Sequence, residues 1–192
     1  MAVQYLPVTW NEYHALARKL AASLLDQTPP FDLIVAISRG GLTLGHLLSD
    51  LLRIGIATIT IQSYTDIQTH GETTVTERLR RPIRGKRILL ADDVADSGKT
   101  FKRAVSYLKK LHPADITTVA MFYKPHSEFH PDFYAGQTTR WILFPYELTE
   151  MIFLVTKKME KEGKSKKEIQ VALESLGYTP EEIAYVRRHF LV

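Results

Sequence analysis

The stretch that decides the fold is ILLADDVADSGKT, which runs from Ile88 to Thr100. Ile88 to Ala91 form a short continuous apolar run, which is typical of a buried strand in a parallel sheet. From Lys99 onward, apolar residues recur at helical spacing. The stretch therefore predicts a strand, a short loop and a helix that starts near Lys99.

The predicted loop has the composition of a phosphate-binding site. It lies at the carboxyl end of a strand, where backbone amides and the helix dipole attract an anion. Ser97, Gly98 and Thr100 suit this site, because glycine lets the backbone approach closely and hydroxyl groups donate hydrogen bonds. The ending SGKT also occurs in the P-loop of nucleoside triphosphatases, but Asp93 stands where that motif requires its first glycine.

Three aspartates accompany the predicted phosphate site: Asp92, Asp93 and Asp96. Carboxylates that faced a phosphate would repel it, so Asp92 and Asp93 are better suited to sugar hydroxyls or to a bound cation such as Mg²⁺. A phosphate in the loop and a sugar diol on the neighbouring carboxylates together describe a site for a ribose 5-phosphate group.

The stretch resembles the 5-phosphoribosyl-1-pyrophosphate (PRPP) motif of the type I phosphoribosyltransferases. That motif has two acids, two mostly apolar residues, an acid, Ser or Thr, Gly, any residue and Thr, and residues 92–100 match every position. The resemblance implies an α/β fold with a central, mostly parallel sheet flanked by helices, and Mg²⁺ bound with PRPP. It assigns the 5-phosphate to Ser97, Gly98, Lys99 and Thr100. Asp92 and Asp93 would bind the ribose hydroxyls directly or through metal, and Asp96 would accept a proton of the base.

A second loop of the same construction precedes this motif. Asp32 to Ile37 reads as a buried strand, and SRGG at residues 38–41 leads into a Leu-rich helix. A tight turn alone would explain SRGG. With the PRPP motif present, SRGG matches the pyrophosphate loop of the family, in which Ser38, Arg39 and the amides of Gly40 and Gly41 would hold the departing diphosphate.

The segment from Gly55 to Ser63 is rich in Ile and Thr and predicts a strand. Residues 65–84 are polar and contain four arginines, which fits a solvated hairpin or loop. In purine phosphoribosyltransferases a Ser-Tyr pair opens a flexible loop that closes over the reaction centre. The resemblance assigns this role to Ser63 and Tyr64, and closure would exclude water from a cation-like transition state.

Lys124 follows a predicted strand at Asp115 to Tyr123. A lysine at this place is commonly exposed, but the carboxyl end of a parallel strand is also where ligands bind. By resemblance, Lys124 donates to the exocyclic oxygen of a 6-oxopurine. The segment that follows, 127–139, is rich in turn residues and is expected to pack as part of a lid. His126 and His130 are four residues apart, but the prolines at 125 and 131 disfavour a helix there, so we expect no metal site.

The stretch WILFPYE at residues 141–147 predicts a final strand that ends at Pro145. It resembles a W-x-x-x-P-aromatic-acid segment of bacterial and archaeal xanthine-guanine and hypoxanthine enzymes. The resemblance assigns base stacking to Trp141, base-edge recognition to the backbone of Ile142, and an acid near magnesium to Glu147, so that the metal residues would be Asp93 and Glu147. Tyr146 and Glu147 stand where Trp and Asp are frequent, and the longer acid leaves the metal contact open.

Composition bears on the location of the protein, on membrane spans and on the charge of its ligands. The 192 residues include no cysteine, which excludes disulfides and fits a cytoplasmic location. No apolar run approaches the roughly 20 residues of a membrane span, and we expect no secretory signal. A net charge of +4 favours anionic ligands but is too small to indicate nucleic acid binding. We expect a phosphoribosyltransferase domain at 1–147 and a helical extension at 148–192, with capping boxes at Thr9 and Ser165 and a further helix start at Thr179.

These features together predict a purine phosphoribosyltransferase of the 6-oxopurine type that acts in purine salvage, and the family resemblance implies a homodimer or homotetramer. A regulator with the same fold that senses PRPP or nucleotides and binds RNA or DNA is the alternative from another class. The presence of Asp96, Lys124 and Trp141 favours the enzyme. Lys124 also opposes an adenine or orotate enzyme, because a donor suits an oxo group better than an amino group. The sequence leaves the choice of 6-oxopurine open.

Overall fold

A computed structural model describes residues 4–27, 30–63 and 73–191. The chain packs as two compact units. One consists of residues 1–13 and 140–192, and the other of residues 14–139. No helix among the described residues is long and apolar enough to span a bilayer.

The larger unit is built on a sheet whose six described strands have the order β4-β3-β2-β5-β6-β7. Four of the pairings are parallel, and only β3 and β4 are antiparallel. The strand bounds are β2 Leu33–Ser38, β3 Ile56–Ser63, β4 Thr73–Glu77, β5 Arg87–Ala95, β6 Asp115–Tyr123 and β7 Phe133–Gln137. This mostly parallel sheet confirms the predicted fold class.

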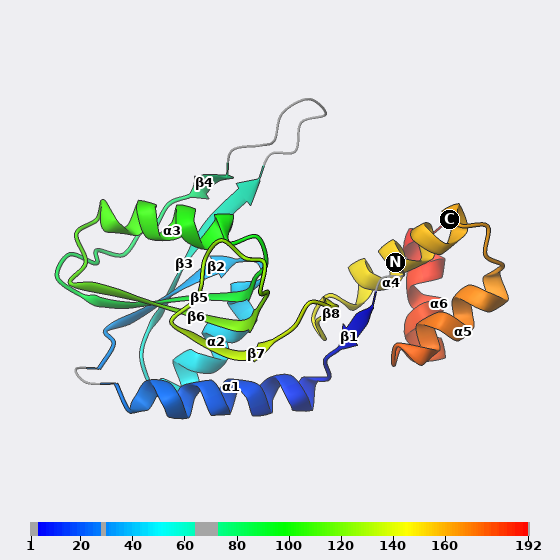
Figure 1. The fold of residues 1–192 in the computed structure, drawn as a ribbon, viewed down its shortest axis with the longest axis horizontal. Helices are drawn as coiled ribbons and strands as arrows, with labels where there is room; N and C mark the ends of the chain where they lie inside the picture. The colour runs from blue at the N-terminus through cyan, green and yellow to red at the C-terminus, as the bar shows by residue number, and fades with distance from the viewer. Residues whose placement is uncertain (1–3, 28–29, 64–72, 192) are drawn as a thin grey trace. The chain divides into compact units, whose positions relative to one another are not determined.

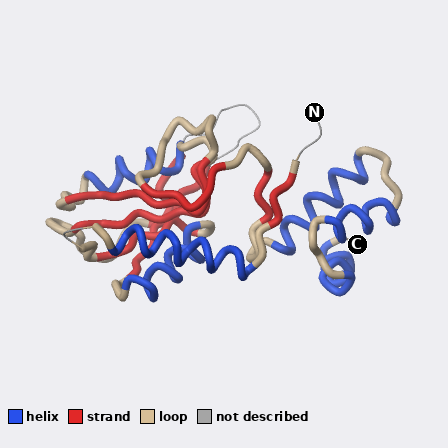
Figure 2. The backbone as a smooth tube through the Cα atoms, turned by 60° about the horizontal axis from the view of Figure 1, so that its bottom comes forward, coloured by secondary structure: helices blue, strands red, loops and turns tan. Residues whose placement is uncertain are grey.

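Helices cover both faces of this sheet. In Figures 1 and 2, α3 (Lys99–Lys109) lies on one face, and α2 (Gly41–Leu52) lies on the other with the part of α1 (Trp10–Leu25) that belongs to this unit. The central strands are therefore buried on both sides, which explains why they read as continuous apolar runs. One core cluster joins the sheet to α3 through side chains that include Ile37, Leu90, Phe101 and Leu108.

Two segments of the larger unit differ from the sequence-based expectation. The strand predicted for Ile88–Ala91 continues to Ala95 as β5, because Val94 and Ala95 pair with β6. Asp92 and Asp93 therefore lie within the strand and not in the loop after it. Part of the expected lid is β7, which pairs in parallel with β6 and packs Gly136 closely against Phe122. The arginine-rich segment, expected to be a hairpin or loop, includes β4, which pairs antiparallel with β3.

The smaller unit contains a two-stranded parallel sheet and three helices. In the sheet, β1 (Tyr5–Pro7) pairs with β8 (Trp141–Leu143), and Tyr5 lies opposite Trp141. The helices are α4 (Leu148–Lys161), α5 (Lys166–Ser175) and α6 (Pro180–Phe190). Their shared core includes Ile152, Leu173 and Ile183.

The structure confirms the helix starts that the sequence predicts. The hydroxyl of Thr9 accepts from the backbone amide of Glu12, whose carboxylate accepts from the amide of Thr9. The same reciprocal pairs begin α5 at Ser165 and α6 at Thr179. Such boxes satisfy amides that have no partner within the helix, so they define where each helix begins.

Candidate active site

The pyrophosphate-type loop joins β2 to α2, and its glycines are required by close packing. A Cβ on Gly40 would lie 2.3 Å from Oδ2 of Asp93, and a Cβ on Gly41 would lie 2.4 Å from the carbonyl oxygen of Ala91. The backbone of the SRGG loop therefore lies directly against the aspartates of β5. Because β2 and β5 are neighbours in the sheet, the two predicted anion loops lie side by side at the carboxyl ends of these strands. The peptide bond between Ser38 and Arg39 is cis.

Asp92 and Asp93 are buried carboxylates at the carboxyl end of β5, with exposed fractions of 7% and 9%. The backbone amide of Asp93 donates to Oδ1 of Asp92 at 3.0 Å. Burial and repulsion from Asp93 hold the pKa of Asp92 well above its ordinary value, although the amides of Asp93 and Gly41 oppose this shift by donating to the carboxylate. A ligand that brings hydrogen-bond donors or positive charge would therefore stabilise the charged form of this pair.

The loop after β5 begins α3 as the sequence predicts. Gly98 has a φ of +82°, and the helix begins at Lys99. A Cβ on Gly98 would lie 2.5 Å from the backbone nitrogen of Phe129. The amide of Glu128 donates to the carbonyl of Ser97 at 3.1 Å, so the segment after β6 packs on the loop and supports it.

Lys124 lies directly after β6, and its backbone amide donates to the carbonyl of Ala95 at 3.1 Å. The side chain is buried, with only 6% exposed. Burial lowers the pKa of Lys124, while the negative charge of Asp96 partly counteracts this effect. The structure thus places the two predicted base-side groups, Lys124 and Asp96, directly after two adjacent strands, where the charge of one acts on the other.

His126 is a site residue that the sequence reasoning did not assign to this site. Its Nε2 lies 2.8 Å from Oδ1 of Asp96, and both side chains are more than half exposed. The ring of His130 instead packs against Tyr123 and Tyr134 at centroid distances of 4.7 and 5.4 Å. The sequence did contain one signal for this role. His126 stands two residues after Lys124, and Lys124 directly follows β6, the strand beside β5.

The remaining predicted site residues belong to other parts of the chain. Ser63 is the last residue of β3, and Tyr64 lies outside the described residues. In the smaller unit, Trp141 is 54% exposed on β8 and Ile142 is buried beside it. Glu147 is the N-cap residue of α4, and its carbonyl accepts from the amide of Met151. Trp141 is therefore not a core residue of its unit, and its ring is accessible for stacking.

The fold agrees with comparisons to known proteins. The family model described as the phosphoribosyl transferase domain matches residues 9–150. The chain belongs to the phosphoribosyltransferase family. The matched range includes both anion loops, Lys124 and the segment from Trp141 to Glu147.

Relatives of this phosphoribosyltransferase include the xanthine-guanine phosphoribosyltransferase of Gluconobacter oxydans (strain 621H), which is 32% identical over 149 residues, 76% of this chain and 86% of that protein. A crystal structure of a purine phosphoribosyltransferase from Pyrococcus horikoshii Ot3 is 28% identical with a TM-score of 0.69. That comparison covers 74% of this chain and 93% of the other. The xanthine-guanine-hypoxanthine phosphoribosyltransferase of Helicobacter pylori has the same fold, with a TM-score of 0.67 at 20% identity over 74% of this chain and 94% of the other.

The carboxylates of this phosphoribosyltransferase fit a magnesium ion that a substrate brings with it. Among the described residues, no group of three or more His, Cys, Asp or Glu side chains could hold a metal ion. Asp92 and Asp93 offer two adjacent carboxylates at the site. Mg²⁺ is commonly bound by one or two carboxylates together with substrate phosphates and water, so this donor set suits it.

Replacing Gly98 by alanine should destabilise the larger unit for two reasons, the positive φ of this position and a steric clash of the new Cβ. A non-glycine residue in the left-handed region costs roughly 1–2 kcal/mol, and the new Cβ would also meet the backbone of Phe129 at 2.5 Å. Gly85→Ala is the matched control, because Gly85 has a φ of +70° with no atom within 4 Å of its built Cβ. Denaturant unfolding should show a larger loss for Gly98→Ala, and equal losses would contradict the packing argument.

Proposed function

We propose that this phosphoribosyltransferase transfers the 5-phosphoribosyl group of PRPP to a 6-oxopurine, which is xanthine, guanine or hypoxanthine. The products would be the nucleoside 5′-monophosphate and pyrophosphate, as in purine salvage. The observation that carries the proposal is the buried ammonium of Lys124 beside the carboxylate of Asp96. The names of the Gluconobacter and Pyrococcus relatives, a xanthine-guanine and a purine phosphoribosyltransferase, support the same substrate class.

The proposed reaction exchanges one bond at the anomeric carbon of the ribose for another. The bond to the diphosphate oxygen breaks and its electron pair leaves with pyrophosphate, while a ring nitrogen of the purine forms the new bond. The proton of the purine ring passes to Asp96. His126 would hold Oδ1 of Asp96 at 2.8 Å, so that the other oxygen faces the base. We treat His126 as a positioning residue.

The site would bind PRPP through both of its phosphate groups, the 5-phosphate and the diphosphate. The loop from Ser97 to Thr100 provides the hydroxyls and helix amides for the 5-phosphate. Arg39 and the amides of the SRGG loop would stabilise the negative charge that develops on the diphosphate. Asp92 and Asp93 would accept from the ribose hydroxyls, because their desolvation favours a ligand that donates to them.

Magnesium would be held at Asp93, with PRPP supplying further ligands, and Glu147 remains the second proposed acid. When bound, Mg²⁺ supplies positive charge that offsets the charge of the departing diphosphate. We expect turnover to stop when EDTA removes Mg²⁺ and to return when Mg²⁺ is added in excess. Full turnover in EDTA would contradict a role for the metal.

Base recognition would combine one donor and one stacking surface. The ammonium of Lys124 donates to the 6-oxo group, and this choice opposes adenine, whose amino group is itself a donor. The exposed ring of Trp141 would stack on the purine, an interaction that contributes roughly 1–3 kcal/mol per base. The backbone of Ile142 would read the edge of the base. A cytoplasmic location and assembly as a homodimer or homotetramer remain predictions from the family.

The test is a product assay with PRPP and Mg²⁺ in which hypoxanthine, guanine, xanthine, adenine and orotate are offered in parallel. Nucleoside monophosphate and pyrophosphate should appear in equal amounts with at least one 6-oxopurine. Turnover with adenine or orotate alone would contradict the role of Lys124. Tight PRPP binding without turnover on any base, together with salt-sensitive binding to RNA or DNA, would favour the regulator.

A further inference from the structure

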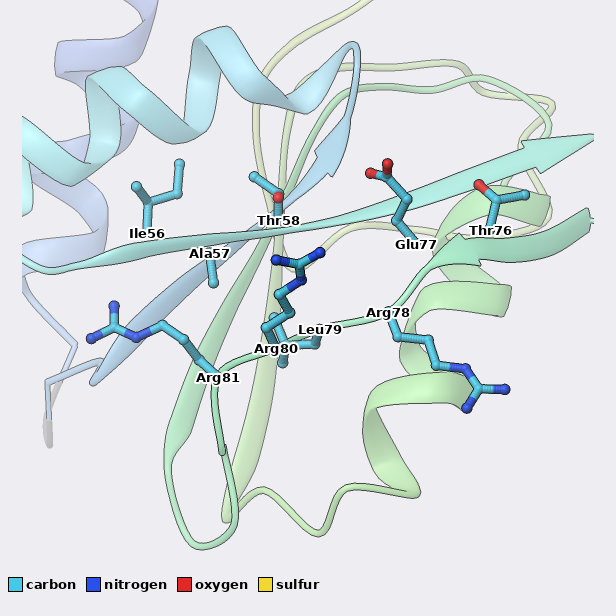
Figure 3. A pocket seen from close by; sticks show the side chains of 9 residues that line it. All are labelled: Ile56, Ala57, Thr58, Thr76, Glu77, Arg78, Leu79, Arg80 and Arg81. Carbon is cyan, nitrogen blue, oxygen red and sulfur yellow. The ribbon is translucent and has the colours of Figure 1, made fainter.

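The larger unit contains a second cavity that the proposed function does not use. It is lined by the first three residues of β3, Ile56 to Thr58, and by the segment 76–81 (Figure 3). Its volume is about 680 Å³. Sites for small molecules typically have 300–1,000 Å³, so this cavity is large enough for a ligand of nucleotide size.

The cavity extends toward the opposite end of the strands from the candidate active site. Ile56 is in register with Ile34 on β2, which is in register with Leu89 near the start of β5. Because these strands are parallel, Ile56 lies near their amino ends. The two anion loops follow the carboxyl ends of β2 and β5. A ligand in this cavity would therefore leave the PRPP loops accessible.

The cavity exists because the hairpin partner of β3 is short. β4 pairs only with Thr60 to Ser63, and the register shifts between Thr60 and Ile61. Among the described residues, the start of β3 thus has a strand partner only on the β2 side. The segment after Glu77 passes this open edge without joining the sheet. An open strand edge presents backbone donors and acceptors, which here border the cavity.

Two guanidinium groups define the charge of the cavity. In Figure 3 the side chains of Arg80 and Arg81 reach toward the β3 residues, whereas Arg78 extends away from them. Arg81 lies over the chain just before β3, since a Cβ on Gly55 would be 2.9 Å from its Nη1. Neither Arg80 nor Arg81 forms an ion pair or side-chain hydrogen bond with another described residue. Both groups are therefore available to an incoming anion.

The lining favours a phosphorylated ligand. Guanidinium groups bind phosphate oxygens through paired hydrogen bonds, which a single point charge cannot reproduce. The cavity also presents apolar side chains at Ile56 and Leu79 and one carboxylate, Glu77, whose Oε2 accepts from the hydroxyl of Thr60 at 2.6 Å. This carboxylate reduces the net positive charge of the cavity lining. Two arginines together with one acid therefore suit a compact oligophosphate better than a long polyanion.

We propose that the cavity at the start of β3 binds the oligophosphate group of a small molecule, held by Arg80 and Arg81. The two sources of this group are a nucleoside di- or triphosphate and an inorganic oligophosphate. In a nucleotide, the base would lie on the apolar lining and the sugar hydroxyls would donate to Glu77. The site is separate from the PRPP loops and does not depend on the reaction proposed above.

The test measures equilibrium binding of ATP, GTP and inorganic tripolyphosphate to the full chain near physiological salt, with and without saturating PRPP and Mg²⁺. The double variant Arg80→Gln/Arg81→Gln should weaken oligophosphate binding at least tenfold. The matched control is Arg84→Gln/Arg188→Gln, which removes the same charge from exposed residues outside the cavity, and it should change binding less than twofold. Thermal unfolding of both variants checks that the fold is intact.

Each outcome bears on the proposal. Tighter binding of a nucleotide than of tripolyphosphate would support a nucleoside polyphosphate, and equal binding would support recognition of the oligophosphate alone. Equal losses in the two double variants would overturn the proposal, because the effect would then be one of net charge. Complete displacement by PRPP would also overturn it, since the bound anion would occupy the active site. Binding of single-stranded RNA but of none of the three small probes would overturn it as well.

Discussion

Asp96→Asn should lower kcat by a factor of about 10² or more, because general base catalysis contributes typically 10²- to 10⁴-fold. Asparagine keeps the size of the side chain but cannot accept the purine proton as a carboxylate does. The KM for PRPP should change little, since the 5-phosphate loop and the Asp92–Asp93 pair are untouched. Steady-state kinetics with both substrates varied separates the two effects. Unchanged turnover would show that another group accepts the proton.

His126→Asn is the companion variant for this test. It removes the partner of Asp96 Oδ1 and retains the carboxylate. If His126 only positions Asp96, kcat should fall by much less than in Asp96→Asn, and His126→Asn should add little in the Asp96→Asn background. A loss in His126→Asn as large as in Asp96→Asn would instead indicate that His126 takes part directly in proton transfer.

Lys124→Met should weaken binding of the base by about 10- to 100-fold, because a hydrogen bond to a charged group contributes roughly 1.5–3 kcal/mol. Methionine has a similar length and lacks the donor. The effect should appear in the KM for the 6-oxopurine and leave the KM for PRPP nearly unchanged. The stability of the protein should not fall, since burial already disfavours the charged form of Lys124, as its lowered pKa indicates.

Lys109→Met is the matched control for Lys124→Met, because Lys109 is exposed at the end of α3. It should leave both KM values unchanged. A large fall in the stability of Lys124→Met, measured by denaturant unfolding, would mean that the ammonium supports the fold. The change in KM would then be an indirect effect.

The fold was predictable because its signals are local. The apolar runs that became β2 and the first half of β5 contain every buried residue of β2 and the first four buried residues of β5. The capping boxes at Ser165 and Thr179 mark helix starts within four residues. The missed strands lack such signals. β1 is three residues long and ends in Pro7, and it depends on a partner more than 130 residues away in the chain. β7 contains Gly136 and is only partly buried.

The site was predictable where one motif holds the residues together, as in the stretch from Asp92 to Thr100. What the sequence lacked was contact information between motifs. The burial of Lys124 depends on the pairing of β6 with β5, and the contact between His126 and Asp96 spans 30 residues. The packing of Gly40 on Asp93 likewise requires that β2 and β5 be neighbours, which spacing alone does not reveal.

The pairing of β2 with β5 also has a consequence for how the protein acquires its activity during synthesis. Leu33 pairs with Ile88, so 55 positions of chain separate the two halves of the anion site. A nascent chain that has emerged only through β3 can form the β2–β3 pair, yet it holds the SRGG loop without the aspartates against which that loop packs. Affinity for PRPP should therefore arise in one step when β5 inserts, without a partly competent precursor.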